Sequence, residues 1–193
     1  MEDIKNCNLC EICINHKPIN GVGNVNADIM FVLSKPNYYT VKHNDIFKSE
    51  IGKLIHKLLN MITIDVEDVY ITHLVKGRSL TIKKKNILAC KPYLKDEIDF
   101  VKPKIIVTMG FIPNKVFLKS NIPLSNHIGK AYLTNEGSYV LPMYDLNFIF
   151  RDVRYHHLAI QDFANLYKLY KEFVNPNIVV FEDNLHSVIK KAL

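Results

Sequence analysis

Three of the four cysteines lie within one seven-residue stretch near the start of the chain. The stretch reads Cys-Asn-Leu-Cys-Glu-Ile-Cys and holds Cys7, Cys10 and Cys13, whereas Cys90 follows much later. In a cytosolic protein, closely spaced cysteines are more typical of metal ligands than of disulfide partners. The spacing therefore favours a thiolate metal site, and ordinary buried thiols are the alternative.

A second candidate site follows a run of apolar residues. The sequence Phe-Val-Leu-Ser-Lys-Pro-Asn at 31–37 leaves a buried strand, and open α/β sheets bind ligands in loops at the carboxyl ends of strands. Ser34 and Lys35 offer a hydroxyl and an ammonium group, but the loop has no carboxylate. A serine hydroxyl is too weakly acidic to act as a general base. Lys35 suits a phosphate contact, and a solvated lysine beside a structural proline is the alternative.

Length and composition describe an ordinary soluble domain. The chain has 193 residues, of which 48% are hydrophobic and 23% are charged, enough for one substantial core. No apolar run approaches the roughly 18 residues of a membrane span, and the acidic start lacks the features of a signal peptide. We therefore expect a cytoplasmic protein. The net charge of +6 suits a polyanionic partner, although lysine-rich proteins often bind no nucleic acid.

Apolar periodicity predicts strands that alternate with helices. The residues from Ser49 to 62 repeat with the spacing of an amphipathic helix, and Pro92 is expected to start a fresh turn within a helix at 86–101. Alternation of this kind predicts one α/β domain with a largely parallel sheet. The expected strands are 27–33, 69–75, 104–109 and 138–144, with an extra one at 177–183; the other expected helices are 112–119 and 156–173.

Several separated segments then occur in an order that resembles one known family. They are Cys-Asn-Leu-Cys, Asn-Ala-Asp-Ile-Met-Phe-Val, Pro36, Phe47 with Gly52, Val-Tyr-Ile-Thr followed by Val-Lys, Ala-Cys-Lys-Pro-Tyr-Leu, and Lys-Ile-Ile-Val-Thr-Met-Gly. This order is similar to the family 4, iron–sulfur uracil-DNA glycosylases over about residues 7–173, without gaps from 27 to 77. The resemblance implies one domain over 1–193, a three-layer α/β/α sandwich with a central, mostly parallel four-stranded sheet, and an added tail from 175.

The resemblance also implies chemistry, in which a flipped uracil is cut from its deoxyribose without a cofactor. Phe47 corresponds to the stacking phenylalanine, and Ser34 replaces the acidic residue that handles the water. His73 replaces the uracil-reading asparagine, but an imidazole carries its donor and acceptor on opposite sides of the ring. Tyr144 and Asp145 fall on a Tyr-His-Pro motif. An ionised Asp145 would repel the departing anion, unless it activates water instead.

The family holds a [4Fe–4S] cluster with four cysteines, and this chain matches three of them. The matching residues are Cys7, Cys10 and Cys90, whereas the fourth ligand position falls on Gly77. Cys13 is a candidate replacement, because Cys-x2-Cys-x2-Cys is the spacing of bacterial ferredoxins. A structural zinc site with four thiolates, or no metal, remains an alternative. Either metal would be structural.

The family's DNA-facing segments suggest contacts in this chain. The lysine run before the second helix lies in such a segment, although a solvated lysine run is the alternative. Phe148 or Arg151 stands where the family wedges a loop into the duplex. The expected DNA contacts are Lys35, Lys83, Lys84, Lys85 and Arg151.

Two functions remain open from the sequence. The first is a base-excision DNA glycosylase with an atypical active site that acts on uracil or another lesion, with Asp145, His73 and Ser34 as catalytic candidates. Phe47, His73 and Tyr144 would bind the base. The second is an inactive relative that binds DNA, single- or double-stranded, or joins another repair or replication protein. In both cases we expect a monomer without membrane contact.

Overall fold

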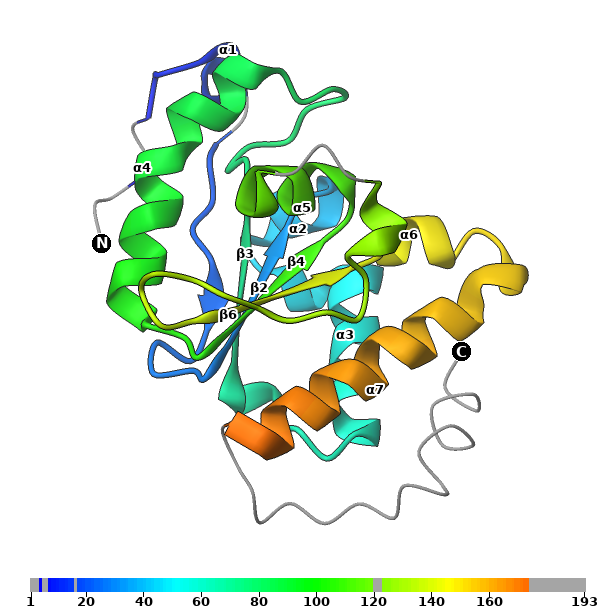
Figure 1. Ribbon diagram of the computed structural model, residues 1–193. Helices are drawn as coiled ribbons and strands as arrows, with labels where there is room; N and C mark the ends of the chain where they lie inside the picture. Colours follow the sequence, from blue (N-terminus) through cyan, green and yellow to red (C-terminus); the bar gives the residue numbers. More distant parts are fainter. Residues whose placement is uncertain (1–3, 5–6, 16, 120–122, 174–193) are drawn as a thin grey trace.

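The computed structural model describes residues 4, 7–15, 17–119 and 123–173. Its centre is a six-stranded sheet in the order β1-β3-β2-β4-β6-β5 (Figure 1). The four inner strands are parallel: β2 (Ile29–Leu33), β3 (Val69–His73), β4 (Ile105–Met109) and β6 (Tyr139–Met143). The predicted four-stranded parallel core is thus confirmed.

Two short strands at the sheet edges were not predicted. β1 (Val22–Gly23) pairs antiparallel with β3, and β5 (Tyr132–Leu133) pairs antiparallel with β6. Each has only two residues, too few for a period-two pattern to show in the sequence. They extend the predicted sheet without changing its parallel centre.

Helices cover both faces of the sheet and make the predicted α/β/α sandwich (Figure 1). α3 and α7 pack on one face, whereas α4 and α5 pack on the other. The helices are α1 (Glu11–Asn15), α2 (Tyr38–His43), α3 (Glu50–Met61), α4 (Lys84–Val101), α5 (Phe111–Leu118), α6 (Leu146–Ile149) and α7 (His156–Phe173). Short 3-10 helices are η2 (Ile46–Lys48), η3 (Val66–Asp68), η4 (Leu124–Asn126) and η5 (Val153–Tyr155).

The strands are apolar throughout because each face meets a different helical layer. All five residues of β2 are buried. Phe31 packs towards α7, where its ring lies 6.4 Å from that of Phe163. Met30 and Val32 point the other way, into the core that holds Leu94 of α4. This alternation explains a continuous apolar run in place of an alternating one.

The turn that leads into α3 depends on a close backbone approach. Ser49 caps α3 by accepting a hydrogen bond from the Gly52 N–H at 3.2 Å. A Cβ atom at Gly52 would lie 2.1 Å from the carbonyl oxygen of Ile46. A glycine is therefore required for η2, which carries Phe47, to lie against the first turn of α3.

One predicted detail was wrong. α4 runs without a break from Lys84 to Val101 and contains Pro92, where a fresh turn was expected. Pro92 is exposed, and the carbonyl that loses its N–H partner belongs to Leu88, whose side chain is also exposed. Water can solvate that carbonyl, so the helix continues.

Two further expectations concern the limits of the chain. The extra strand predicted at 177–183 lies outside the described residues. Across the residues that the structure does describe, no helix is long and apolar enough to span a membrane.

Candidate functional site

The predicted site residues gather at one edge of the sheet. His73 ends β3 and stands level with Leu33, the last residue of β2, so Ser34 follows directly beside it. β4 and β6 end level with each other, and Tyr144 and Asp145 follow β6. The carboxyl ends of parallel strands form the usual binding edge of an α/β sheet. Ser34, His73, Tyr144 and Asp145 therefore all lie at this edge, and their roles stay predictions.

His73 is buried without a hydrogen-bond partner. Its side chain belongs to a residue that is 2% exposed, and neither ring nitrogen has a partner. Burial and, to a smaller extent, the nearby charge of Lys76 lower the pKa of His73 to about 3. The imidazole is therefore neutral at pH 7, with one donor and one acceptor available. A buried, unpaired polar group costs roughly 1–3 kcal/mol, so it calls for a ligand or a water.

Asp145 uses part of its carboxylate to begin a helix. Its Oδ1 accepts hydrogen bonds from the backbone N–H and the side-chain amide of Asn147, at 2.8 and 2.9 Å. This caps α6. The side chain also lies against Gly110, where a Cβ atom would be 3.1 Å from the Asp145 Cβ. The carboxylate is held in place, and its Oδ2 lies towards the end of β4.

Asp162 was missed by the sequence analysis. It lies on α7 and is 3% exposed; its Oδ2 accepts a hydrogen bond from the Tyr144 N–H at 2.8 Å, whereas Oδ1 has no partner. Burial raises the pKa of Asp162 to about 7, although the Tyr144 N–H opposes this rise. The available signal was an acidic residue directly before Phe163, on the apolar face of the predicted helix. Asp162 positions the backbone at the end of β6.

The two aromatic candidates are both partly exposed at the border of the larger core. Phe47, in η2, and Tyr144 are both half-buried and pack against the larger core. The backbone N–H of Phe47 donates a hydrogen bond to Asp45 at 2.8 Å. Each side chain is thus only partly exposed, and the base-binding roles of both residues stay predictions.

Lys35 binds protein backbone in this structure. Its ammonium donates to the carbonyl oxygens of Ser79 and Leu80, the latter at 2.7 Å. Burial lowers the pKa of Lys35, and the charge of Arg78 adds to this effect. Arg78 in turn lies 5.7 Å from the centre of the Tyr38 ring. The loop after β2 is therefore tied to the loop after β3, and the predicted phosphate contact of Lys35 is untested.

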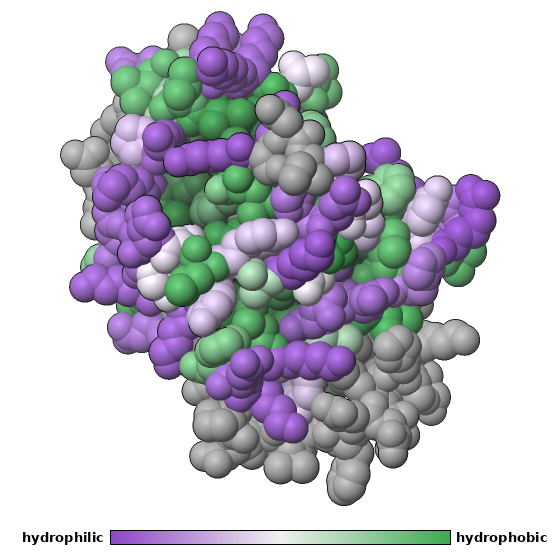
Figure 2. Space-filling view, viewed as in Figure 1, coloured by the Kyte–Doolittle hydropathy of each residue, from purple (hydrophilic) through white to green (hydrophobic). Residues whose placement is uncertain are grey.

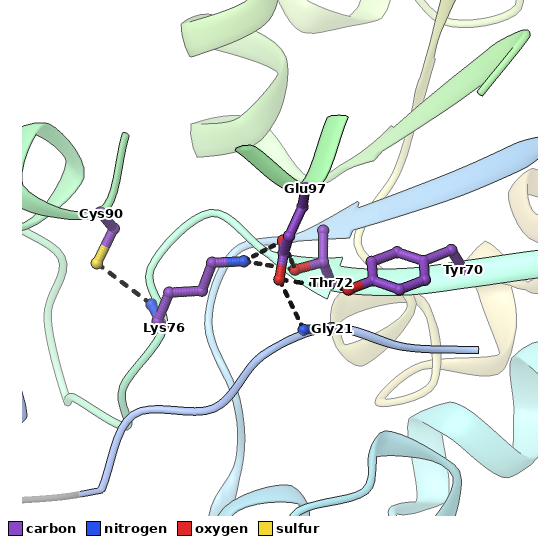
Figure 3. Close-up of polar contacts among 6 residues, drawn as sticks. All are labelled: Gly21, Tyr70, Thr72, Lys76, Cys90 and Glu97. Atoms are coloured by element: carbon purple, nitrogen blue, oxygen red, sulfur yellow. Dashed lines mark hydrogen bonds and ion pairs between the residues drawn. The ribbon is translucent and has the colours of Figure 1, made fainter. Parts of the chain in front are cut away.

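A buried polar network lies behind the loop that follows β3 (Figure 3). Lys76 and Glu97 form an ion pair through the Lys76 Nζ and the Glu97 Oε2. Thr72 bonds to both groups, at 2.6 Å from the ammonium and 2.5 Å from the carboxylate. The other Glu97 oxygen accepts hydrogen bonds from the Gly21 N–H at 2.8 Å and the Tyr70 hydroxyl at 3.5 Å. Strand β3, helix α4 and the segment before β1 are joined here.

The four cysteines converge next to this network. Cys10 and Cys90 are buried in an apolar cluster with Val75, and Cys13 packs against it. The backbone N–H of Lys76 donates to the Cys90 sulfur at 3.4 Å. Burial raises the pKa of Cys13, and a hydrogen bond with Cys7 and the charges of Cys10 and Cys90 raise it further. All four predicted metal-binding thiols thus lie within interaction range of one another.

These thiols form no disulfide. Within the described part of the chain, no three histidine, cysteine or acidic side chains are spaced around one point as ligands of a single metal ion. The donor set nevertheless consists of four sulfur atoms, of which those of Cys10, Cys13 and Cys90 lie in an apolar cluster, and an N–H group is directed at the sulfur of Cys90. That chemistry fits an iron–sulfur cluster or a zinc ion.

Of the three consecutive lysines predicted to bind DNA, two contact α1. Lys83 and Lys85 pair with Glu11, at 3.9 and 3.0 Å. The hydrogen bond with Lys85 is the main reason why the pKa of Glu11 falls to about 2. Lys84 is exposed. The surface around α1 and the start of α4, at the top of the view, contains both hydrophobic and hydrophilic residues (Figure 2).

Several side chains of the segment after β6 are exposed, whereas Leu146 and Ile149 are buried. Arg151 is exposed in the turn after α6. Phe148 is 49% exposed and its ring lies 4.8 Å from that of Tyr155. Val153 shows still more of its surface. The structure therefore leaves Phe148 and Arg151 accessible, and their DNA contacts stay predictions.

Comparison with known proteins agrees with this geometry. The model of the uracil DNA glycosylase superfamily matches residues 20–168. A type-4 uracil-DNA glycosylase of Saccharolobus solfataricus is 34% identical over 136 residues, which cover 67% of this chain and 62% of the relative. The enzyme of the same name from Sulfurisphaera tokodaii is 36% identical over 110 residues, 55% of this chain and 49% of that protein.

A relative of another kind covers more of this chain. A DNA polymerase of Bacillus phage SP01 is 29% identical over 171 residues, which are 86% of this chain but 18% of the polymerase. The chain also spans less than two thirds of the length of the two archaeal glycosylases. From the family match and these relatives, the chain belongs to the uracil-DNA glycosylase superfamily, in its type-4 branch.

Proposed function

We propose that this chain is a base-excision DNA repair protein that binds a flipped-out base at the carboxyl edge of its sheet and excises it with an atypical active site. The single observation that carries this proposal is His73, which is buried at that edge with two unpaired ring nitrogens. The names of its relatives supply the reaction class and DNA as the substrate. The proposal includes a cytoplasmic monomer that acts on single- or double-stranded DNA.

In this proposal, His73 recognises the base differently from the asparagine that the resemblance implies at this position. The neutral imidazole of His73 gives one nitrogen to the base as donor or acceptor, while the other nitrogen faces away. The second polar contact to the base must come from another group at this edge. Phe47 offers a ring for stacking, because it is half-buried beside the first turn of α3.

Bond cleavage needs help for the sugar cation, the water and the leaving base. Ser34 cannot take a proton from water at neutral pH, so Asp145 is the carboxylate that we assign to the sugar and the water. His73 is neutral and stabilises the leaving base only by N–H donation. Loss of one catalytic group typically costs about two to four orders of magnitude. We therefore expect slow excision of uracil and faster excision of a lesion whose anion is more stable.

A single-turnover assay tests this function. The pure protein, in excess, is mixed with labelled DNA that contains one uracil or one oxidised pyrimidine, and abasic sites are revealed by alkali. Asp145→Asn should abolish excision while DNA binding persists. Asp152→Asn is the matched control, because Asp152 caps η5 as Asp145 caps α6 but lies outside the strand-end edge. Equal excision by Asp145→Asn and the parent protein would refute the assignment.

A second candidate function is supported by the polymerase match. A segment of a phage DNA polymerase resembles 86% of this chain, which supports a binding domain that works beside a replication protein. The engagement of Asp145 as a helix cap also agrees with this alternative. DNA binding without any excision over hours, on every substrate tested, would favour the binding domain over the enzyme.

A further inference from the structure

At position 77, where the resemblance leads us to expect a cluster cysteine, the space for a side chain is occupied by a residue of α1. A Cβ atom at Gly77 would lie 2.4 Å from the Cγ2 of Ile12. Ile12 is buried in the same cluster as Cys10, Val75 and Cys90. A side chain at 77 would therefore enter the cysteine cluster, and Ile12 of α1 takes that space.

The residue after Ile12 brings a thiol to the same place. Cys13 belongs to the first turn of α1, where its N–H donates to the Cys10 carbonyl at 3.2 Å. Its thiol forms a hydrogen bond with the thiol of Cys7 and interacts electrostatically with those of Cys10 and Cys90. Compared with the ligand set that the resemblance implies, this chain therefore lacks a thiol in the loop after β3, at Gly77, and has an additional thiol in α1, at Cys13.

From this difference we propose that Cys13 takes the place of the cysteine expected at position 77, so that the iron–sulfur cluster implied by the family would be held here by Cys7, Cys10, Cys13 and Cys90. The spacing of the first three cysteines is that of ferredoxin ligands. Two anchors hold the segments that carry the ligands. Glu11 is paired with Lys83 and Lys85, and the Lys76 N–H bonds to the Cys90 sulfur. The inference does not depend on base excision, since the cluster is structural.

Metal content and spectroscopy of the full chain test the ligand set. Protein purified and reconstituted without oxygen should contain about four irons and four sulfides per chain, with the broad visible absorption of a cluster. Cys13→Ser should lose at least half of the iron and sulfide. Ile12→Ala, the neighbouring control, should retain them. One zinc per chain without sulfide in the parent protein, or unchanged iron in Cys13→Ser, would overturn the proposal.

A relocation experiment separates ligation from folding. In the Cys13→Ser background, Gly77→Cys together with Ile12→Ala returns a thiol to position 77 and opens the space for it. This triple variant should regain iron, sulfide and the visible band.

Alkylation of the parent protein with its cluster bound needs no variant. It tests the ligand set even if Cys13→Ser does not fold. Cys13 should be protected as well as Cys7, Cys10 and Cys90, and all four should react after the iron is chelated. Selective alkylation of Cys13 in the loaded protein would overturn the proposal.

Discussion

Lys76 and Glu97 form an ion pair in which both side chains are almost fully buried, 0% and 2% exposed. The pair joins the loop after β3 to the C-terminal part of α4, and the backbone N–H of Lys76 also donates a hydrogen bond to the Cys90 sulfur. A buried charge that loses its partner costs far more than the pair itself contributes. The two residues therefore form a unit that should be changed together or not at all.

The first prediction concerns the stability of this unit. Lys76→Met or Glu97→Leu alone should lower the free energy of unfolding by about 3–5 kcal/mol, because each leaves a buried charged group without its ionic partner. The double variant Lys76→Met with Glu97→Leu should lose less than either single variant. Urea denaturation of the four proteins measures this coupling.

The exposed pair of Lys53 and Glu50 is the control for the first prediction. Its side chains are 61% and 82% exposed, so Lys53→Met should change the free energy of unfolding by less than about 1 kcal/mol. Additive losses in the Lys76 and Glu97 double variant would contradict the idea that the buried pair acts as a unit.

The second prediction is a pH profile set by His73. The pKa of His73 falls from 6.5 to about 3 on folding, so between these values the unfolded chain binds one more proton. The stability that His73 contributes is full above pH 6.5 and is lost as the pH falls towards 3, at about 1.4 kcal/mol per pH unit. In His73→Asn this loss at acid pH should disappear from urea unfolding measured between pH 4.5 and 6.5.

The third prediction is the opposite profile from Asp162. Its pKa rises from 3.8 to about 7 on folding, so here the folded state binds the extra proton. The stability from Asp162 is full below pH 3.8 and is lost as the pH rises through 7, again at about 1.4 kcal/mol per pH unit. Asp162→Asn should remove this loss while its amide oxygen still accepts the Tyr144 N–H.

The two profiles overlap between about pH 4 and 6.5 and cancel in the parent protein. The free energy of unfolding should therefore rise with pH in Asp162→Asn and fall with pH in His73→Asn, and the two slopes should differ by about 2.7 kcal/mol per pH unit. Other titrating groups contribute equally to both variants. Equal slopes in the two variants would mean that neither side chain is buried as described.

The sequence was sufficient to predict the frame of this fold because its signals are periodic. The continuous apolar strands and the helix from Ser49 all lie within two residues of their predicted bounds, and the helix at 156–173 was predicted without error. β1, β5 and α6 are too short for periodicity to identify them. The effect of Pro92 was predicted wrongly. The free energy lost through one exposed proline is smaller than the free energy gained by packing the continuous helix α4.

For the candidate site, the sequence allowed the positions of the residues in the fold to be predicted, but not the partners of their side chains. The ends of the strands placed Ser34, His73 and Asp145 at one edge, since parallel strands end together. Side-chain partners depend on tertiary contacts, which no spacing reveals. The binding of Lys35 to the carbonyls of Ser79 and Leu80 and the burial of Asp162 against the Tyr144 N–H are such contacts.

The fourth prediction distinguishes the three consecutive lysines before and at the start of α4. Lys83 and Lys85 pair with Glu11, whereas Lys84 has no ion-pair partner among residues that the structure describes. Lys84→Met should weaken DNA binding and reduce the slope of log affinity against log salt by about one, as expected for one lost phosphate contact. Titrations at several salt concentrations measure the slope. Weaker binding with an unchanged slope would exclude a phosphate contact.

The control for Lys84 lies on a different helix. Lys53→Met removes the same charge from α3, on the opposite face of the sheet from α4. Its affinity for DNA and its salt slope should match those of the parent protein. If Lys53→Met reduced the slope as much as Lys84→Met, net charge and not position would govern binding.

The fifth prediction tests the close approach at Gly52. By helix propensity alone, Gly52→Ala should stabilise α3 by up to about 1 kcal/mol. The added Cβ would lie 2.1 Å from the Ile46 carbonyl oxygen and 2.8 Å from the Phe47 Cα. We therefore expect a loss of about 1–3 kcal/mol in the free energy of unfolding, as for other overpacked sites.

The displaced backbone carries Phe47, so Gly52→Ala should also weaken the binding of DNA that contains an unpaired or damaged base. Asn60→Ala is the control, because Asn60 is exposed near the end of the same helix and its replacement should change stability by no more than about 0.5 kcal/mol. Urea unfolding and fluorescence titration with intact and lesion-containing DNA measure both effects. A more stable Gly52→Ala protein with unchanged base discrimination would show that η2 does not depend on this contact.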